Sequence, residues 1–133
     1  GDAYLCASGL SDHNERPTDM IRAALQIQAF LQKLKTVRSA EGRPYFEARI
    51  GIHFGPVVAG VVGTKKFAYD IWGDTVNTAA RTEETCEAGR VNVTGAVHDM
   101  VAEEFQWEYR GKLAAKNKVE MEMWYCLGPK EAN

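Results

Sequence analysis

The sequence predicts a single domain of the α+β class, in which a mixed, largely antiparallel sheet carries helices packed on one face. Segments with strand-like and helix-like patterns alternate along the chain, and the last two strand-like segments look antiparallel. The length of 133 residues suits one domain. Hydrophobic residues make up 45% of the chain and charged residues 26%, which is typical of a globular domain with a core of its own.

The longest predicted helix covers residues 20–34. Its apolar side chains recur at helical spacing and form one stripe: Met20, Ala24, Ile27, Leu31 and Leu34. Thr18 is the predicted N-cap, since it follows Pro17 and precedes the stripe. Residues 41–44, which contain Gly42 and Pro44, are expected to end the helix.

The remaining segments supply the predicted sheet. Strands are expected at residues 3–8, 46–54, 90–94, 106–110 and 119–127. Residues 57–62 form a short apolar run between Gly55 and Gly63. A short helix is expected at residues 96–103. Together with the strand and helix discussed below, this order of elements predicts a ferredoxin-like arrangement.

Charge and cysteine content exclude several classes of function. The net charge is −2 with no long basic block, which argues against a nucleic-acid partner. The three cysteines lie far apart and lack metal-ligand spacing, so we expect reduced, mostly buried thiols in a cytoplasmic protein. No signal peptide is present, and no apolar run approaches the ~20 residues of a membrane span.

The most informative stretch is residues 67–81, with the sequence FAYDIWGDTVNTAAR. It predicts a short apolar strand, a turn at Gly73, and a helix that begins near Val76 with Asp74 or Thr75 as its N-cap. Three of its polar side chains are not needed by a packed core: Asp70, Asn77 and Arg81.

Asn77 and Arg81 are four residues apart, so they share one helix face, while Val76, Ala79 and Ala80 cluster on another. Arginine offers a planar cationic fork for phosphate oxygens, and asparagine donates to nearby ether or hydroxyl oxygens. With the acceptor Asp70, this unit indicates a site for a base and a phosphate. The spacing also fits an ordinary solvated helix face, and Asp70 could equally brace the turn at Gly73, so both alternatives stay open.

Four groups of residues, in order along the chain, form a larger pattern. They are GDAY (1–4) with ASGL (7–10), RIGIHFGPVVAGVVG (49–63), YDIWGDTVN (69–77) with Ala80-Arg81, and Tyr109-Arg110-Gly111 with residues 116–120. Together they resemble the catalytic domain of class III nucleotidyl cyclases, specifically the adenylyl cyclases. The resemblance covers nearly the whole chain.

This resemblance implies an enzyme of signal transduction that converts ATP to 3′,5′-cyclic AMP and pyrophosphate by a two-metal mechanism. Two Mg²⁺ or Mn²⁺ ions per site are implied, and Asp2 matches one of their aspartate ligands, in keeping with the preference of these ions for oxygen. Asp70 matches the residue that accepts from the adenine 6-amino group, and the backbone of Ile71 and Trp72 would line the base.

The other matched residues would serve the ribose and the phosphates. Asn77 matches the residue that orients the ribose, Arg81 the one that stabilises the pentavalent phosphorus, and Lys118 the one that holds the terminal phosphates. The chain carries both Asp2 and the Asn77–Arg81 pair, which the family places on different subunits. A head-to-tail homodimer is therefore implied, with regulatory or sensor domains in a parent protein that is either free or attached to a membrane.

Two alternatives accompany this assignment. Guanylyl cyclases of the family usually carry cysteine at the position of Asp70, so the carboxylate favours ATP over GTP. A non-catalytic nucleotide-binding or dimerisation module of the same fold is the other alternative, and the intact set of matched residues argues against it.

The resemblance also predicts missing parts. The family's first strand and helix, with a second metal aspartate, and an adenine-selecting lysine would precede Gly1. Residues 1–133 alone are therefore expected to be inactive. Outside the predicted site, His53, Trp107, Trp124 and Tyr125 are interpreted as core residues.

Overall fold

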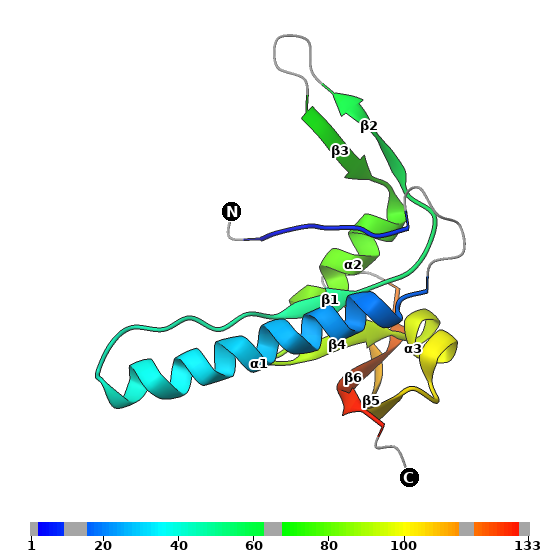
Figure 1. Cartoon of the computed structure of the whole chain (residues 1–133). Coiled ribbons are helices and arrows are strands. Elements are labelled where there is room, and N and C mark those ends of the chain that lie inside the picture. Colours follow the sequence, from blue (N-terminus) through cyan, green and yellow to red (C-terminus); the bar gives the residue numbers. More distant parts are fainter. Residues whose placement is uncertain (1–2, 10–15, 63–67, 115–118, 131–133) are drawn as a thin grey trace.

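The computed structural model describes residues 3–9, 16–62, 68–114 and 119–130. Three helices and six strands follow one another along these residues (Figure 1). They are α1 (Thr18–Ala40), β1 (Ile50–Ile52), β2 (Val58–Val62), β3 (Ala68–Trp72), α2 (Asp74–Glu84), β4 (Val91–Thr94), α3 (Gly95–Val101), β5 (Phe105–Leu113) and β6 (Met121–Pro129). The α+β class predicted from the sequence is confirmed.

Four strands form a mixed sheet in the order β1-β4-β6-β5. β1 and β4 are parallel, whereas β6 runs antiparallel to both β4 and β5, as predicted for the closing strands. β2 and β3 form a separate antiparallel pair, which stands away from the four-stranded sheet (Figure 1).

Helices α1 and α3 pack on one face of the four-stranded sheet and enclose the main core. That core consists of Ile21, Ala24, Ile52, Val91, Val93, Val97, Val101, Phe105 and Cys126. Trp107 and Trp124 are partly buried against it, and Tyr125 is buried, so the interpretation of these aromatic residues as core residues is confirmed. Burial of this apolar surface is the main term that stabilises the arrangement.

Helix α2 lies against the other face of the sheet. Side chains alternate between faces along a strand, so Gly51 points away from the core that its neighbour Ile52 enters. A Cβ atom at Gly51 would lie only 2.6 Å from the carbonyl carbon of Thr82 in α2. Asn92, the register partner of Gly51, donates from Nδ2 to the Thr82 carbonyl at 2.8 Å. Helices α1 and α3 thus cover one face and α2 covers the other, so the prediction that the helices pack on one face is wrong for α2.

Helix α1 begins and ends differently from the prediction. It extends to Ala40 rather than Leu34, and its N-cap is Pro17. The prediction of Thr18 as N-cap is wrong, because the Thr18 hydroxyl lies within hydrogen-bond distance of the Glu104 carboxylate, 3.2 Å from Oε1. The predicted stop is confirmed: Gly42 has a φ of 68°, which favours glycine, and Arg43 N–H returns to the Arg38 carbonyl at 2.8 Å.

Two predicted strands are shorter or absent. Residues 3–8 form no strand, since within the described part of the chain no segment pairs with their backbone. The strand expected at residues 46–54 is reduced to β1, because only Ile50–Ile52 pair with β4. Phe46 and Phe54, at its expected ends, are 63% and 46% exposed.

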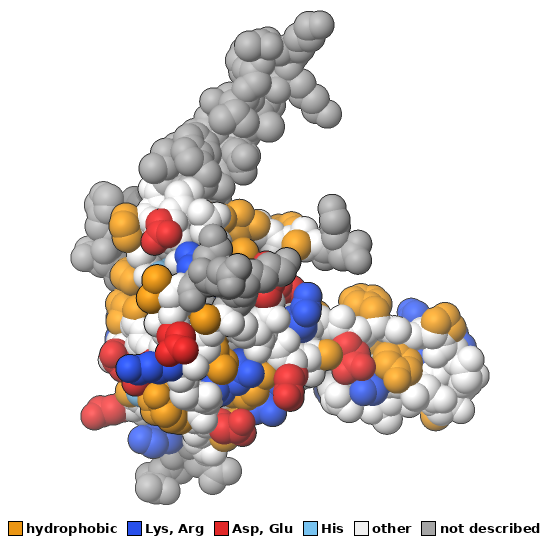
Figure 2. Space-filling model, turned by 180° about the vertical axis from the view of Figure 1, so that it is seen from behind, with side chains coloured by type: hydrophobic (Ala, Val, Ile, Leu, Met, Phe, Trp, Pro, Cys, Tyr) orange, Lys and Arg blue, Asp and Glu red, His pale blue; other side chains and the backbone are white. Residues whose placement is uncertain are grey.

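The C-terminal half of α1 and the segment after it project from the body of the molecule (Figure 1). Figure 2 shows hydrophobic side chains on this projection, where Val37, Tyr45 and Phe46 are exposed. Among the described residues, no helix combines the length and the hydrophobicity that crossing a membrane requires.

Candidate active site

The site is built on the unit formed by β3, Gly73 and α2. α2 begins at Asp74 with Gly73 as its N-cap, so the predicted cap at Asp74 or Thr75 is wrong by one or two residues. Gly73 has a φ of 125°, a conformation that favours glycine, and its carbonyl accepts from Asn77 N–H at 3.2 Å. Gly55 abuts the first turn of the helix, since a Cβ there would lie 2.6 Å from Thr75 Oγ1.

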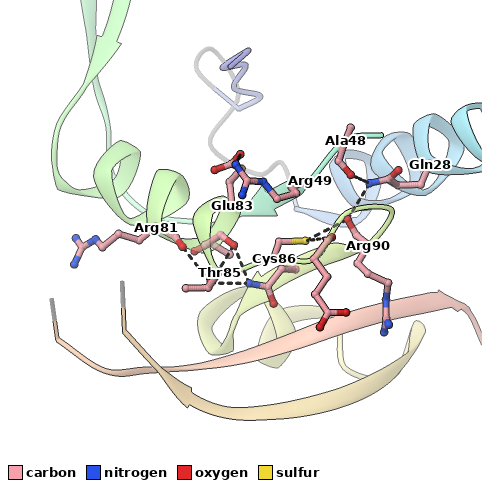
Figure 3. A network of polar contacts seen from close by, with 11 residues as sticks. Gln28, Ala48, Arg49, Arg81, Glu83, Thr85, Cys86 and Arg90 are labelled. Carbon is pink, nitrogen blue, oxygen red and sulfur yellow. Dashed lines mark hydrogen bonds and ion pairs between the residues drawn. The ribbon is translucent and has the colours of Figure 1, made fainter. Parts of the chain in front are cut away.

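Asn77 and Arg81 lie one turn apart on α2, as their spacing predicts. Arg81 donates from Nε to the Asn77 carbonyl at 3.4 Å and from Nη2 to Thr78 Oγ1 at 3.3 Å. Its Nη2 also lies 3.7 Å from Oδ1 of Asp74. Figure 3 shows the guanidinium pointing away from the polar network that joins the other end of α2 to the sheet.

These contacts hold Arg81 only weakly. All of them come from its own helix, and they are longer than the ~2.7–2.9 Å of strong charge-assisted hydrogen bonds. The Asp74 side chain is 94% exposed, and ion pairs with exposed carboxylates contribute little. A phosphate at this position would therefore replace weak partners of the guanidinium with stronger ones.

The Asp74 contact was missed in the sequence. Residues seven apart complete nearly two helical turns and so lie on one face, and Asp74 and Arg81 have this spacing. The seven-residue spacing could therefore have predicted the contact between Asp74 and Arg81, but Asp74 was interpreted as a helix cap.

Asp70, Ile71 and Trp72 form the end of β3, directly before the Gly73 turn. Their backbone register opposes Gly60, Ala59 and Val58 of β2, respectively. The predicted strand, turn and helix are therefore confirmed as one unit, while the reading of a base by these three residues stays a prediction.

Two predicted site residues, Asp2 and Lys118, lie outside the described residues. Within the described ranges, no three His, Cys, Asp or Glu side chains gather as metal ligands would. The described part of the chain does not by itself fit a metal centre.

His53 lies closer to the site than the sequence suggested. It is half-buried after β1, with Nδ1 2.7 Å from Thr94 Oγ1. Burial lowers the pKa of His53, the negative charge of Asp74 raises it, and the positive charge of Arg81 lowers it further. The imidazole is therefore influenced by Asp74 in the first turn of α2 and by Arg81 in its last turn.

We expect His53 to make the domain less stable in mild acid. Because its pKa is lowered in the folded state, the unfolded chain binds the proton more readily, and stability falls as pH drops through the unfolded value of about 6.5. The measurement is urea unfolding of the wild type and of His53→Asn at pH 7.5 and pH 5.5. The wild type should lose more free energy of unfolding than the variant, and equal losses would contradict the expectation.

Comparison with known proteins places the chain in one family of catalytic domains. Residues 1–128 match the family described as the adenylate and guanylate cyclase catalytic domain. An adenylate cyclase of Mycobacterium bovis is 38% identical over 136 residues, covering 99% of this chain and 29% of the relative. Human atrial natriuretic peptide receptor 2 is 39% identical over 137 residues, covering 98% of this chain and 13% of the receptor. The chain thus spans less than a third of either relative.

Solved structures agree with the sequence matches. The guanylate cyclase domain of RhGC from Catenaria anguillulae, solved in complex with GTP, has a TM-score of 0.79 and 30% identity. The similarity covers 92% of this chain and 65% of that one. The family match over residues 1–128 confirms the resemblance seen in the sequence: this chain belongs to the class III adenylate and guanylate cyclase catalytic domains.

Proposed function

We propose that this domain, in its complete protein, is an adenylyl cyclase that converts ATP to 3′,5′-cyclic AMP and pyrophosphate. The observation that supports it is the unit formed by β3, Gly73 and α2. In this unit the backbone of Asp70 at the end of β3 is followed by one helix face that carries the exposed Asn77 and the partly buried Arg81. A carboxylate, an amide and a guanidinium in this order suit a base, a ribose and a reacting phosphate.

The reaction is an intramolecular displacement. The ribose 3′-oxygen releases its proton to water and bonds to the α-phosphorus, while the bond from that phosphorus to the leaving pyrophosphate breaks. Negative charge builds on the pentavalent phosphorus, and the fixed positive charge of Arg81 offsets it. Asn77 donates to the ribose and limits its orientations, so that positioning and electrostatics supply most of the rate.

Selection of the base is assigned to the end of β3. The Asp70 carboxylate accepts from the 6-amino group of adenine, and the backbone of Ile71 and Trp72 lines the ring. Guanine carries a carbonyl oxygen at the same position of the ring, which would face the carboxylate without a proton between the two acceptors. The carboxylate thus disfavours GTP.

The rest of the proposed site comes from residues outside the described ranges and from a second subunit. Asp2 is proposed as a ligand of Mg²⁺ or Mn²⁺, and Lys118 as a contact of the terminal phosphates. A head-to-tail homodimer would bring Asp2 of one subunit to Asn77 and Arg81 of the other. A first strand and helix preceding Gly1, further regulatory domains and a cytoplasmic location complete the proposal.

A guanylyl cyclase is the second candidate. It is favoured by the similarity to a guanylate cyclase domain that was solved in complex with GTP. Asp70 argues against it, so a change at this residue separates the two candidates.

We expect Asp70→Cys to reduce the preference for ATP over GTP about tenfold or more, because it removes the acceptor for the 6-amino group. The measurement is kcat/KM for each nucleotide in the complete protein. Glu84→Cys, at an exposed position of α2, is the matched control and should keep the wild-type ratio. An unaltered ratio in Asp70→Cys would remove Asp70 from base selection.

A further inference from the structure

Three side chains of the sheet hold the C-terminal end of α2, and we call them the α2 clamp: Asn92, Arg110 and Tyr125. Asn92 of β4 donates to the Thr82 carbonyl at 2.8 Å. Arg110 of β5 donates from Nη1 to the Thr85 carbonyl at 2.8 Å. The Tyr125 hydroxyl of β6 accepts from Glu87 N–H, just beyond the helix, at 3.0 Å. Each strand of the clamp thus supplies one bond to the end of the helix.

Arg110 is fixed in two ways at once. Its guanidinium lies 4.0 Å from the centre of the Tyr125 ring, and Arg90 lies at the same distance from that ring. Tyr125 itself is buried. Stacking on the ring orients the plane of the guanidinium, and the bond to Thr85 uses that orientation.

The chemistry of a helix end explains why an arginine suits this place. The last carbonyls of a helix have no partner within the helix and carry partial negative charge. Arg110 brings both a donor and a positive charge to the Thr85 carbonyl, and Asn92 serves the Thr82 carbonyl in the interior. The clamp therefore fixes the last turn of α2 against rotation and sliding.

The last turn is also the turn that carries Arg81. Thr85 donates from its N–H and from Oγ1 to the Arg81 carbonyl, at 3.2 and 3.1 Å. A short chain of hydrogen bonds thus runs from Arg110 through Thr85 to the backbone of Arg81, whose guanidinium points away on the far side (Figure 3).

We propose that Arg110 is a positioning residue for the cyclase reaction: through Thr85 it fixes the last turn of α2 and hence the direction of the Arg81 guanidinium. This inference rests on the proposed function, because it assigns Arg110 a role only through Arg81. A displacement of about 1 Å at a reacting group lowers rates by ~10²-fold, so loss of the clamp should appear in the turnover number.

The first test compares Arg110→Ala, Arg110→Lys and Arg90→Ala in the complete protein, with kcat, KM for ATP and Tm as readouts. Arg90 is the matched control, since its side chain stacks on the same ring but pairs with Glu108 rather than with α2. We expect Arg110→Ala to lower kcat about tenfold or more with little change in KM. Arg110→Lys, which keeps the charge and should fold, is expected to recover only part of kcat, and Arg90→Ala to keep it within about twofold.

The second test adds Arg110→Ala or Arg110→Lys to Arg81→Ala. If Arg110 acts through Arg81, the second change lowers kcat no further once Arg81 is gone. Multiplicative losses in the double variants, or a wild-type kcat in Arg110→Lys and Arg110→Ala alongside a lower Tm, would overturn the inference and leave the proposed function standing. A folded wild type that forms no cyclic nucleotide from ATP or GTP would overturn both.

Discussion

Replacing Arg81 with alanine is expected to lower the turnover number of the complete protein by about 10²-fold or more. The guanidinium points away from the polar network at the other end of α2 and is held by long contacts from its own helix, so its removal leaves that network in place. The loss should therefore appear in kcat rather than in folding. The measurement is steady-state cyclic nucleotide formation at saturating ATP, with Tm measured in parallel.

Arg22→Ala supplies the control for this change. Arg22 is an exposed arginine on α1, and its removal alters the net charge equally. It should leave both kcat and Tm near the wild-type values. An unchanged turnover number in Arg81→Ala would remove this residue from the mechanism, and with it the role given to α2.

Gly51→Ala is expected to have the largest effect on stability. Its Cβ would lie 2.6 Å from the Thr82 carbonyl carbon, closer than real Cβ atoms approach other atoms. The obstacle is helix backbone, so the overlap is relieved only if α2 moves as a whole. We expect a loss of about 3 kcal/mol or more, which is a large share of the ~5–15 kcal/mol that stabilises an ordinary domain. Urea unfolding of wild type and variant measures it.

Gly95→Ala is the matched control for the added methyl group. Gly95 begins α3, and a Cβ there meets nothing closer than 3.6 Å. This variant should stay within about 1 kcal/mol of the wild type. Equal stability of Gly51→Ala and Gly95→Ala would mean that α2 does not lie against β1, which would contradict the placement of the site.

Local sequence patterns predicted many of the helices and strands. The apolar stripe placed α1, and the strand, turn and helix around Gly73 were recognised because each has its own periodicity. The far end of α1, from Lys35 to Ala40, was missed because it projects from the body and its side chains form no continuous buried stripe. The N-cap of α2 was misplaced because a glycine with positive φ, rather than a polar side chain, begins the helix.

Contacts between residues far apart in the chain could not be predicted from the sequence. Asn77 and Arg81 follow from helical spacing alone, but the placement of α2 opposite to α1 depends on Gly51 and Asn92 being register partners. The bond from Arg110 to Thr85 joins residues 25 positions apart and exists only once β5 and β6 have paired beneath the helix. A single sequence contains no periodicity that would reveal such a contact.

The measurement that tests the central claim most directly is product formation by the complete protein with ATP or GTP, in the presence of Mg²⁺ or Mn²⁺. The expected result is cyclic AMP from ATP, with a higher kcat/KM than cyclic GMP from GTP, and its loss in Arg81→Ala. A folded protein that produced neither cyclic nucleotide with either metal ion, or that preferred GTP, would contradict the account.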